Sequence, residues 1–385
     1  MTSDKGVKLV ALLSLVAVQT GGALLFKASQ HEGAYAYSPG GAQAAAEAMK
    51  LALSAAFFAR EHARSGGSGG ALRAFAAQVR EPRLLTHYAG LALLYLFINQ
   101  THFVIYAWAD AASVALVKCT STLVTALLLW GALARPISPL QWTAIGQQAC
   151  GLFVVQYDAC AGAPLLSLPV YAALFACVAT SAVAGVWNEN LLKSSATSLH
   201  VQNACLYVLG VALNLAVFAL EGPVPDADGG TPHKRGLLEG YNSTVLGLVT
   251  SQALLGLVVV AVLKYADAVI RMLGNACSVA LLYAYNVAHL GWDVNPTYLA
   301  GCVIVVTSSY GYVAAAAVPT ASDMTGCRAA DAGVQLPRHA VAAGPPPWTS
   351  RSARCFAGVA VALFSMLLLL SAAAGGTTRD VLATG

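Results

Sequence analysis

The sequence has few charged residues and no framework of paired cysteines. Only 10% of its 385 residues are charged, whereas a soluble globular domain carries about 25%. Hydrophobic residues make up 58% of the chain, so a soluble protein of this composition could not cover its surface with polar groups. The nine cysteines form no CxxC pair and most lie in apolar runs, which argues against disulfides and a zinc site. We therefore expect a membrane protein without a metal.

The sequence also lacks the motifs of common soluble enzymes. There is no GxSxG elbow, no HExxH helix and no GxxxxGK[ST] phosphate loop. The net charge of +4 is too small to indicate nucleic-acid binding by bulk charge. We therefore expect neither an enzyme nor a nucleic-acid partner, and no cofactor.

Apolar runs long enough to cross a bilayer recur along the chain. A span needs roughly 20 residues, or fewer inside a bundle. We expect spans near 7–26, 42–60, 85–106, 111–134, 141–157, 169–192, 201–220, 243–263, 267–289, 297–317 and 356–374. The first run lacks a clean small-residue cleavage site and is interrupted at Gln19–Gly22, so we interpret it as a retained helix. The sequence predicts an all-α integral membrane protein.

The basic residues predict an orientation. With the N-terminus in the cytosol, fifteen of the 21 lysines and arginines fall on the cytosolic side, four on the other side and two inside spans. This asymmetry follows the positive-inside rule. Asn242-Ser243-Thr244 is a glycosylation sequon on the predicted luminal side, and whether Asn242 is modified stays open because it lies so near a span.

Two linkers are longer than the others. Residues 60–83 contain a Gly/Ser run and predict a flexible cytosolic connector. Residues 318–355 contain Pro345–Pro347 and several arginines, and predict a disordered cytosolic linker. We therefore expect a working core at 1–317 and an accessory transmembrane helix at 356–374.

Polar residues follow one face of four predicted spans. They are Tyr95, Asn99, His102 and Tyr106; Lys118, Ser121 or Thr122, and Thr125; Asn203, Tyr207, Gly210 and Asn214; and Asp267, Arg271, Asn275, Ser278 and Tyr285. Residues three or four apart share a helix face. One stripe is equally well explained by hydrogen bonds between helices, but four stripes together indicate a pathway for a solute.

Two cations within the spans indicate an anionic solute. An unpaired buried cation costs several kcal/mol, and a phosphate-bearing ligand would supply the missing charge to Arg271 and Lys118. Tyrosines and Trp187 could stack on a base. Two alternatives stay open: Lys118 is neutral or reaches the membrane surface, and Arg271 pairs with Asp267 one turn away.

Two further pairs of charges are expected to be structural. Glu47 and Lys50 are three residues apart, and Glu189 and Lys193 are four apart, so each pair can meet along one helix. A role of Glu47 in proton coupling is the alternative.

Several motifs, in collinear order from about residue 7 to 313, together resemble one family. They are Ala46-Glu47 with Lys50; Tyr95 with Asn99-Gln100 and Ala109–Ala112; Arg135 with Ser138 and Gln141-Trp142; Ala184–Glu189 with Lys193; Gln252-Ala253 with Gly256-Leu257; and Lys264–Asp267 with Arg271. They resemble the nucleotide-sugar transporters of the CMP-sialic acid, UDP-galactose and UDP-N-acetylglucosamine group, within the drug/metabolite transporter superfamily.

This resemblance implies a fold and an activity. It implies ten helices in two inverted five-helix repeats, at about 7–157 and 169–317, with the cavity between them. It implies exchange of a cytosolic pyrimidine nucleotide sugar for luminal nucleoside monophosphate across the Golgi membrane, with the endoplasmic reticulum as alternative, and leaves a homodimer open. The family motifs and the polar stripes together give the expected substrate-binding residues, which are Arg271, Lys118, Lys264, Asn99, Tyr95, Asn275 and Tyr207.

The fourth predicted span departs from the family pattern. The family's YQVTYQLK is replaced by Val114–Ser121, and the lysine stands at 118 instead of at the position of Ser121. The eleventh span is a second departure. Two other functions therefore stay open: transport of another phosphorylated or organic metabolite on the same fold, and a receptor or scaffold that transports nothing.

Overall fold

The computed structural model describes most of the predicted core. The described residues are 2–31, 34–64, 70–80, 82–133, 137–155, 157–158, 163–164, 166–194, 197–223, 233–265, 268–289, 291 and 294–316. The predicted linker 318–355 and accessory helix 356–374 lie outside these residues and stay predictions.

Helices dominate the fold, and they follow the predicted spans closely. They are α1 (Thr2–Ala28), α2 (Pro39–Arg64), α3 (Ala71–Val79), α4 (Pro82–Trp108), α5 (Ala111–Lys118), α6 (Ser121–Leu133), α7 (Pro139–Val155), α8 (Leu168–Ser194), α9 (Leu199–Leu220), α10 (Ser243–Tyr265), α11 (Ala268–His289) and α12 (Pro296–Ala316). Two antiparallel two-residue ladders pair β1 (Gln30–His31) with β2 (Ala34–Tyr35) and β3 (Tyr157–Asp158) with β4 (Ala163–Pro164). The prediction of an all-helical transporter fold is confirmed.

Side-chain caps fix where several helices begin. Asp110 accepts hydrogen bonds from the backbone amides of Ala112 and Ser113 at the start of α5. Ser138 and Gln141 form a reciprocal capping box at the start of α7. Asn242 caps α10 by accepting a bond from the amide of Val245 at 2.9 Å. These caps satisfy amides that the first turn of a helix leaves without partners.

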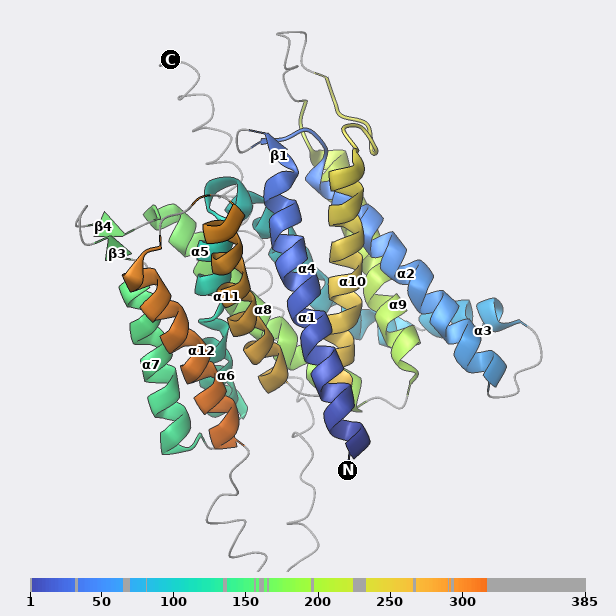
Figure 1. Ribbon diagram of the computed structural model, residues 1–385. Coiled ribbons are helices and arrows are strands. Elements are labelled where there is room, and N and C mark those ends of the chain that lie inside the picture. The colour runs from blue at the N-terminus through green and yellow to red at the C-terminus, as the bar shows by residue number, and fades with distance from the viewer. Residues whose placement is uncertain are drawn as a thin grey trace, which may run out of the picture.

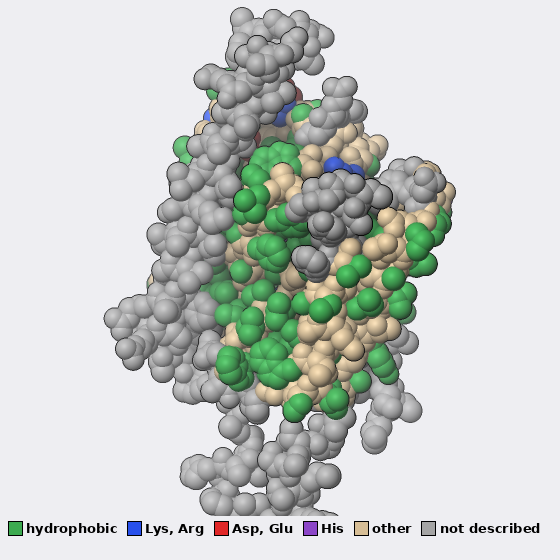
Figure 2. Space-filling model, turned by 90° about the vertical axis from the view of Figure 1, so that its left-hand side faces the viewer, with side chains coloured by type: hydrophobic (Ala, Val, Ile, Leu, Met, Phe, Trp, Pro, Cys, Tyr) green, Lys and Arg blue, Asp and Glu red, His purple; other side chains and the backbone are tan. Residues whose placement is uncertain are grey.

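The surface of the bundle suits a bilayer. Among the described residues, five helical segments are long and apolar enough to cross a membrane: 85–108, 111–128, 168–189, 199–220 and 243–262. The helix α2 falls short by this measure because it carries Gln43, Glu47 and Lys50. On one side of the molecule, hydrophobic side chains are spread over the described surface and charged ones appear only near its upper end (Figure 2).

The helix contacts repeat between the two halves of the chain. α1 packs against α10 and α11, while α8 packs against α4 and α6. Similarly, α4 contacts α9 and α10 contacts α2, whereas α2 pairs with α9 and α7 with α12. Each helix of the first half therefore has a counterpart in the second half with matching neighbours (Figure 1). The counterparts are α1 and α8, α2 and α9, α4 and α10, α5–α6 and α11, and α7 and α12. This is the pattern expected for two related repeats. The repeat boundaries themselves stay a prediction.

The fourth predicted span is two helices and not one. The helix α5 ends at Lys118, a turn follows at 119–120, and α6 begins at Ser121. The amides of Cys119 and Thr120 bond the third residue before them, as in a tightened last turn. Gln148 on α7 donates to the freed carbonyl of Cys119 at 2.9 Å. A broken helix at membrane depth requires such a partner for the backbone.

The connector 60–83 is also more ordered than predicted. The helix α2 continues to Arg64, and α3 fills 71–79. Phe75 and Val79, four residues apart, are buried on one face of α3, and Phe75 lies 5.2 Å from the ring of Phe58. The prediction of a flexible connector over the whole range is therefore wrong, because an apolar face anchors α3; residues 65–69 lie outside the described residues.

Candidate functional site

A cavity lies inside the bundle between α1, α2, α4, α8, α9, α10 and α11, beside the α5–α6 break. The volume in which the centre of a water molecule can lie is about 190 Å³. A single water needs about 10–15 Å³ on this measure, so the cavity has room for several waters. The polar and charged residues on its wall are Gln19, Gln43, Glu47, Lys50, Tyr95, Asn99, His102, Tyr106, Lys118, Ser121, Ser181, Tyr207, Asn214, Gln252, Arg271 and Asn275. Polar groups are costly in a membrane interior, so this concentration indicates a solute site.

Arg271 reaches the cavity from the start of α11. Its Nη2 donates to Ser181 Oγ on α8 at 3.0 Å. A Cβ atom at Gly185 would lie 2.7 Å from Nη1, so the missing side chain leaves room for the guanidinium. Among the described residues no carboxylate pairs with Arg271; Asp267, the alternative partner, lies outside them. Within the described residues, Ser181 is the hydrogen-bond partner given for its five N–H donors, so that part of the structure leaves donors available to an anion.

One turn along α11, Asn275 connects three helices. Its Oδ1 accepts from Gln19 Nε2 on α1 at 2.7 Å, and its Nδ2 donates to Ser121 Oγ on α6 at 3.4 Å. The other amide atom, Gln19 Oε1, is buried with no hydrogen-bond partner among the described residues. Because an unpaired buried acceptor is unfavourable, this oxygen can accept from an N–H or O–H group of a ligand.

Lys118 is the last residue of α5 and has only a neutral partner in the described structure. Its Nζ lies 3.4 Å from the hydroxyl of Tyr106 and 5.2 Å from the centre of that ring. No described carboxylate contacts it. A negatively charged oxygen attracts an ammonium group more strongly than a neutral phenol does and forms shorter hydrogen bonds with it, so an anion in the cavity is a better partner for Lys118 than Tyr106.

A buried ion pair occupies the α2 wall. Lys50 Nζ and Glu47 Oε1 are 2.5 Å apart, with side chains 8% and 6% exposed. Gln43 Nε2 donates to the same carboxylate oxygen at 3.3 Å, and Lys50 Nζ lies 5.0 Å from the ring centre of Tyr207. The geometry is that of a neutralised pair, as the spacing predicts. A role of Glu47 in proton coupling stays a prediction.

Two glycines make room for this pair. A Cβ at Gly210 on α9 would lie 3.0 Å from Glu47 Oε2, and one at Gly256 on α10 would lie 2.7 Å from Lys50 Cδ. The ion pair is therefore enclosed by helices whose close approach depends on the absence of side chains.

The structure brings most of the predicted site together. Arg271, Lys118, Asn99, Tyr95, Asn275, Tyr207, Glu47 and Lys50 all line the one cavity. Tyr95 is further fixed by Asn188 Nδ2, which donates to its hydroxyl at 3.1 Å. Glu189 lies on α8 but is not among the residues of the cavity wall. The side chains of Lys264 and Lys193, and all of Asp267, lie outside the described residues.

Sequence reasoning missed four polar members of the wall. They are Gln19, Gln43, Ser181 and Gln252. Gln43 stands four residues before Glu47 and so shares its helix face, which is a signal that could have found it. Gln19 and Ser181 carry no such signal, because a single neutral polar residue in a span is common and uninformative.

Comparisons with known proteins indicate one family. A family profile described as nucleotide-sugar transporter matches residues 3–313. CMP-sialic acid transporter 4 of Arabidopsis thaliana is 27% identical over 314 residues, which cover 80% of this chain and 84% of that protein. The UDP-galactose translocator of Homo sapiens is 30% identical over 226 residues, 57% of this chain and 56% of that one. A solved crystal structure matches 80% of this chain and 96% of its own with a TM-score of 0.53 at 15% identity, which concerns the fold alone.

Proposed function

Because the chain belongs to the nucleotide-sugar transporter family, we propose that it exchanges a cytosolic pyrimidine nucleotide sugar for a luminal nucleoside monophosphate across the Golgi membrane. The curated relatives are named for CMP-sialic acid and for UDP-galactose. Both names denote a pyrimidine nucleotide joined to a sugar, and we extend that class to this chain. The protein then acts as a carrier by alternating access and not as an enzyme.

One observation supports the proposal above the others. Lys118 and Arg271 enter a single cavity, and neither has a carboxylate partner among the described residues. Their surroundings offer what a nucleotide sugar needs besides phosphate contacts: aromatic rings at Tyr95 and Tyr207, and amides at Asn99 and Asn275. Cations for phosphate, rings for a base and amides for hydroxyl groups fit this substrate class.

The two cations lie at different depths. Ser121 follows Lys118 by three residues, Ser121 contacts Asn275, and Arg271 precedes Asn275 by four residues. Since a helix rises 1.5 Å per residue, the two backbone positions are on the order of 10 Å apart along the bundle axis. Because arginine and lysine have long side chains, Lys118 and Arg271 can both approach one ligand that lies along this axis.

Exchange in sealed proteoliposomes tests the proposal. Vesicles are preloaded with UMP, CMP or GMP, and uptake of labelled UDP-sugars, CMP-sialic acid and GDP-sugars is measured for each. We expect fast uptake only when the vesicles contain UMP or CMP and the nucleotide sugar outside also carries a pyrimidine. Uptake that depends on GMP would make the substrate a purine nucleotide sugar, and no exchange with any pair would contradict transport of nucleotide sugars.

A second candidate is a carrier of another phosphorylated metabolite. The observation that favours it is the position of Lys118 at the end of a broken helix, three residues before the lysine of the family pattern. Sugar phosphates added to the same vesicle panel decide between the two, because uptake of a sugar phosphate without any nucleotide would favour the second.

A further inference from the structure

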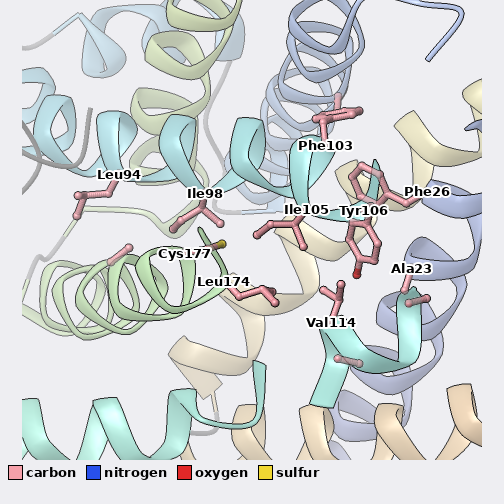
Figure 3. Packing of buried hydrophobic residues seen from close by; sticks show 14 of the residues in the cluster. Ala23, Phe26, Leu94, Ile98, Phe103, Ile105, Tyr106, Val114, Leu174 and Cys177 are labelled. Atoms are coloured by element: carbon pink, nitrogen blue, oxygen red, sulfur yellow. The ribbon is translucent and has the colours of Figure 1, made fainter. Parts of the chain in front are cut away.

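Two stacked aromatic rings form part of the cavity wall. Phe26 at the end of α1 and Tyr106 on α4 lie with ring centres 4.7 Å apart and planes 12° apart. Both line the cavity, and both are only 3% exposed. Figure 3 shows the two rings side by side, with Ala23 nearby on α1. They are the last residues of α1 and α4 in the cavity wall. They therefore lie toward the end of the bundle where the β1–β2 hairpin is found (Figure 1).

A second layer holds these rings in place. Phe103 packs edge-on against Phe26, with ring centres 5.0 Å apart. From the hairpin, the hydroxyl of Tyr35 donates to the carbonyl of Phe103 at 2.8 Å. Lys27 Nζ donates to the carbonyl of Tyr106 at 2.7 Å. We call the group Phe26, Tyr35, Phe103 and Tyr106 the aromatic closure.

Tyr106 belongs to the aromatic closure and also contacts the cation of the site. Its ring stacks on Phe26, while its hydroxyl is the described partner of Lys118 Nζ at 3.4 Å. Tyr106 therefore links the aromatic closure to Lys118, a cation of the cavity. From this double contact we propose that Tyr106 is a positioning residue, which couples binding of an anion at Lys118 to opening of the cavity at the hairpin end. This inference rests on the proposed function, because the anion is the phosphate of the carried nucleotide.

The physical step is a change of partner. Without ligand, Lys118 donates to the Tyr106 hydroxyl and lies near its ring, which fixes that ring against Phe26. A phosphate oxygen is a stronger acceptor for an ammonium group than a neutral phenol, so bound nucleotide draws Lys118 away. The Tyr106 ring then loses one of its restraints and the stack on Phe26 weakens. The empty carrier stays closed at this end and the loaded one opens, which is the requirement for exchange without leak.

Labelling of a native cysteine tests this coupling. Cys177 on α8 is buried and lines the cavity, and Figure 3 shows it to the left of Tyr106, beyond Ile105. The full chain is placed in sealed vesicles, and an impermeant maleimide is added on the side of the hairpin. Modification of Cys177 is followed by mass spectrometry, with the orientation of the molecules determined from an N-terminal tag.

Five variants and the unmodified protein are compared without ligand. Tyr106→Phe keeps the ring and removes the hydroxyl, so labelling should rise about five-fold, as expected for loss of one hydrogen bond. Lys118→Met should give the same rise, and the double variant no further rise. Tyr35→Phe is the matched control, because it removes a hydroxyl from the aromatic closure without touching Lys118. In the second double variant, Tyr35→Phe with Lys118→Met, the two effects should therefore add.

The outcomes separate this inference from the proposed function. In the unmodified protein, UMP or CMP should speed labelling of Cys177, and in Tyr106→Phe it should add little. The inference is overturned if ligand-free Tyr106→Phe labels Cys177 at the same rate as the unmodified protein. It is also overturned if the effects of Tyr106→Phe and Lys118→Met on this rate add. Exchange of nucleotides without any ligand-induced labelling overturns the inference alone. Absence of both exchange and ligand-induced labelling overturns the proposed function and the inference with it.

Discussion

At the scale of the residue, the site depends on three cations and on small residues that make room for two of them. Arg271 passes Gly185, and Lys50 passes Gly256. Holding charge inside a membrane bundle costs several kcal/mol unless a partner neutralises it. Lys50 has Glu47 as its permanent partner, whereas Lys118 and Arg271 have none among the described carboxylates. We therefore expect substitutions at these two positions to affect binding more than folding.

Replacement of Arg271 tests its role directly. Arg271→Ala removes a charge-assisted contact worth roughly 1.5–3 kcal/mol, so affinity for the nucleoside monophosphate should fall about tenfold or more. Arg271→Lys, which restores the residue of the family pattern, should keep much of the binding. Melting temperature with and without ligand measures both effects. A folded Arg271→Ala protein with unchanged ligand-induced stabilisation would place phosphate recognition elsewhere.

Gly185→Ala tests the same cation without touching its charge. The new methyl group would lie 2.7 Å from Nη1 of Arg271, so the guanidinium must move while the backbone can stay in place. We expect nearly normal thermal stability and nucleotide affinity reduced about five-fold, equivalent to about 1 kcal/mol. Gly146→Ala on α7 is the matched control, because nothing lies within 4 Å of its added Cβ. Equal affinities for the two variants would show that Arg271 does not need its present position.

At the scale of the element, the break between α5 and α6 is the feature that sequence reasoning could not provide. Residues 111–134 form one apolar run, and nothing in that run demands a turn at 119–120. The turn is stabilised from outside, by Gln148 of α7. Local patterns report which face of a helix is polar, but they do not report partners that arrive from another helix.

The same distinction explains what could be predicted elsewhere. Helix ends agree with the expected spans within a few residues because apolar runs and caps are local signals. The stripe of Tyr95 and Asn99, and the cations Lys118 and Arg271, were found by helical spacing and by charge. Gln19 became part of the site only through its contact with Asn275 on a helix distant in sequence.

Replacing Gln148 tests the break. Gln148→Leu keeps a similar side-chain size but leaves the carbonyl of Cys119 without its donor. An unsatisfied buried group costs about 1–3 kcal/mol, so we expect a lower melting temperature and slower exchange. Gln147→Leu, at the exposed neighbouring position, should change neither. If Gln148→Leu matches Gln147→Leu in both measurements, the turn holds without this bond.

At the scale of the whole molecule, the ends of the helices alternate between two sides. The N-terminus and the β1–β2 hairpin lie at opposite ends of the bundle (Figure 1). The distribution of basic residues predicts that the N-terminal side is cytosolic. The sidedness of the cavity follows from this: the aromatic closure would then face the lumen.

Tags test this orientation. Tags at the N-terminus and between α2 and α3 should be cut by protease added outside sealed vesicles, and a tag near 225–235 should be protected. The physical reason is the excess of lysine and arginine on the first side, which resists translocation. Protection of the tag between α2 and α3 would reverse the topology and place the aromatic closure on the cytosolic side.

Truncation tests the extent of the working core. The family match ends at residue 313, and the repeating contact pattern is complete with α12. A chain cut after about residue 320 should therefore fold and exchange nucleotides at a near-normal rate in reconstituted vesicles. Loss of exchange by a truncated protein with a normal melting temperature would show that the predicted helix 356–374 belongs to the core.

The turn at 119–120 also has a consequence for how the protein is made. During synthesis, residues 111–134 reach the membrane before Gln148, which follows Cys119 by 29 residues in the chain. A lone apolar segment in lipid must satisfy its own backbone, and a continuous helix does so. We therefore expect the newborn segment to insert as one straight helix, and to acquire its break only after α7 has joined it in the bilayer.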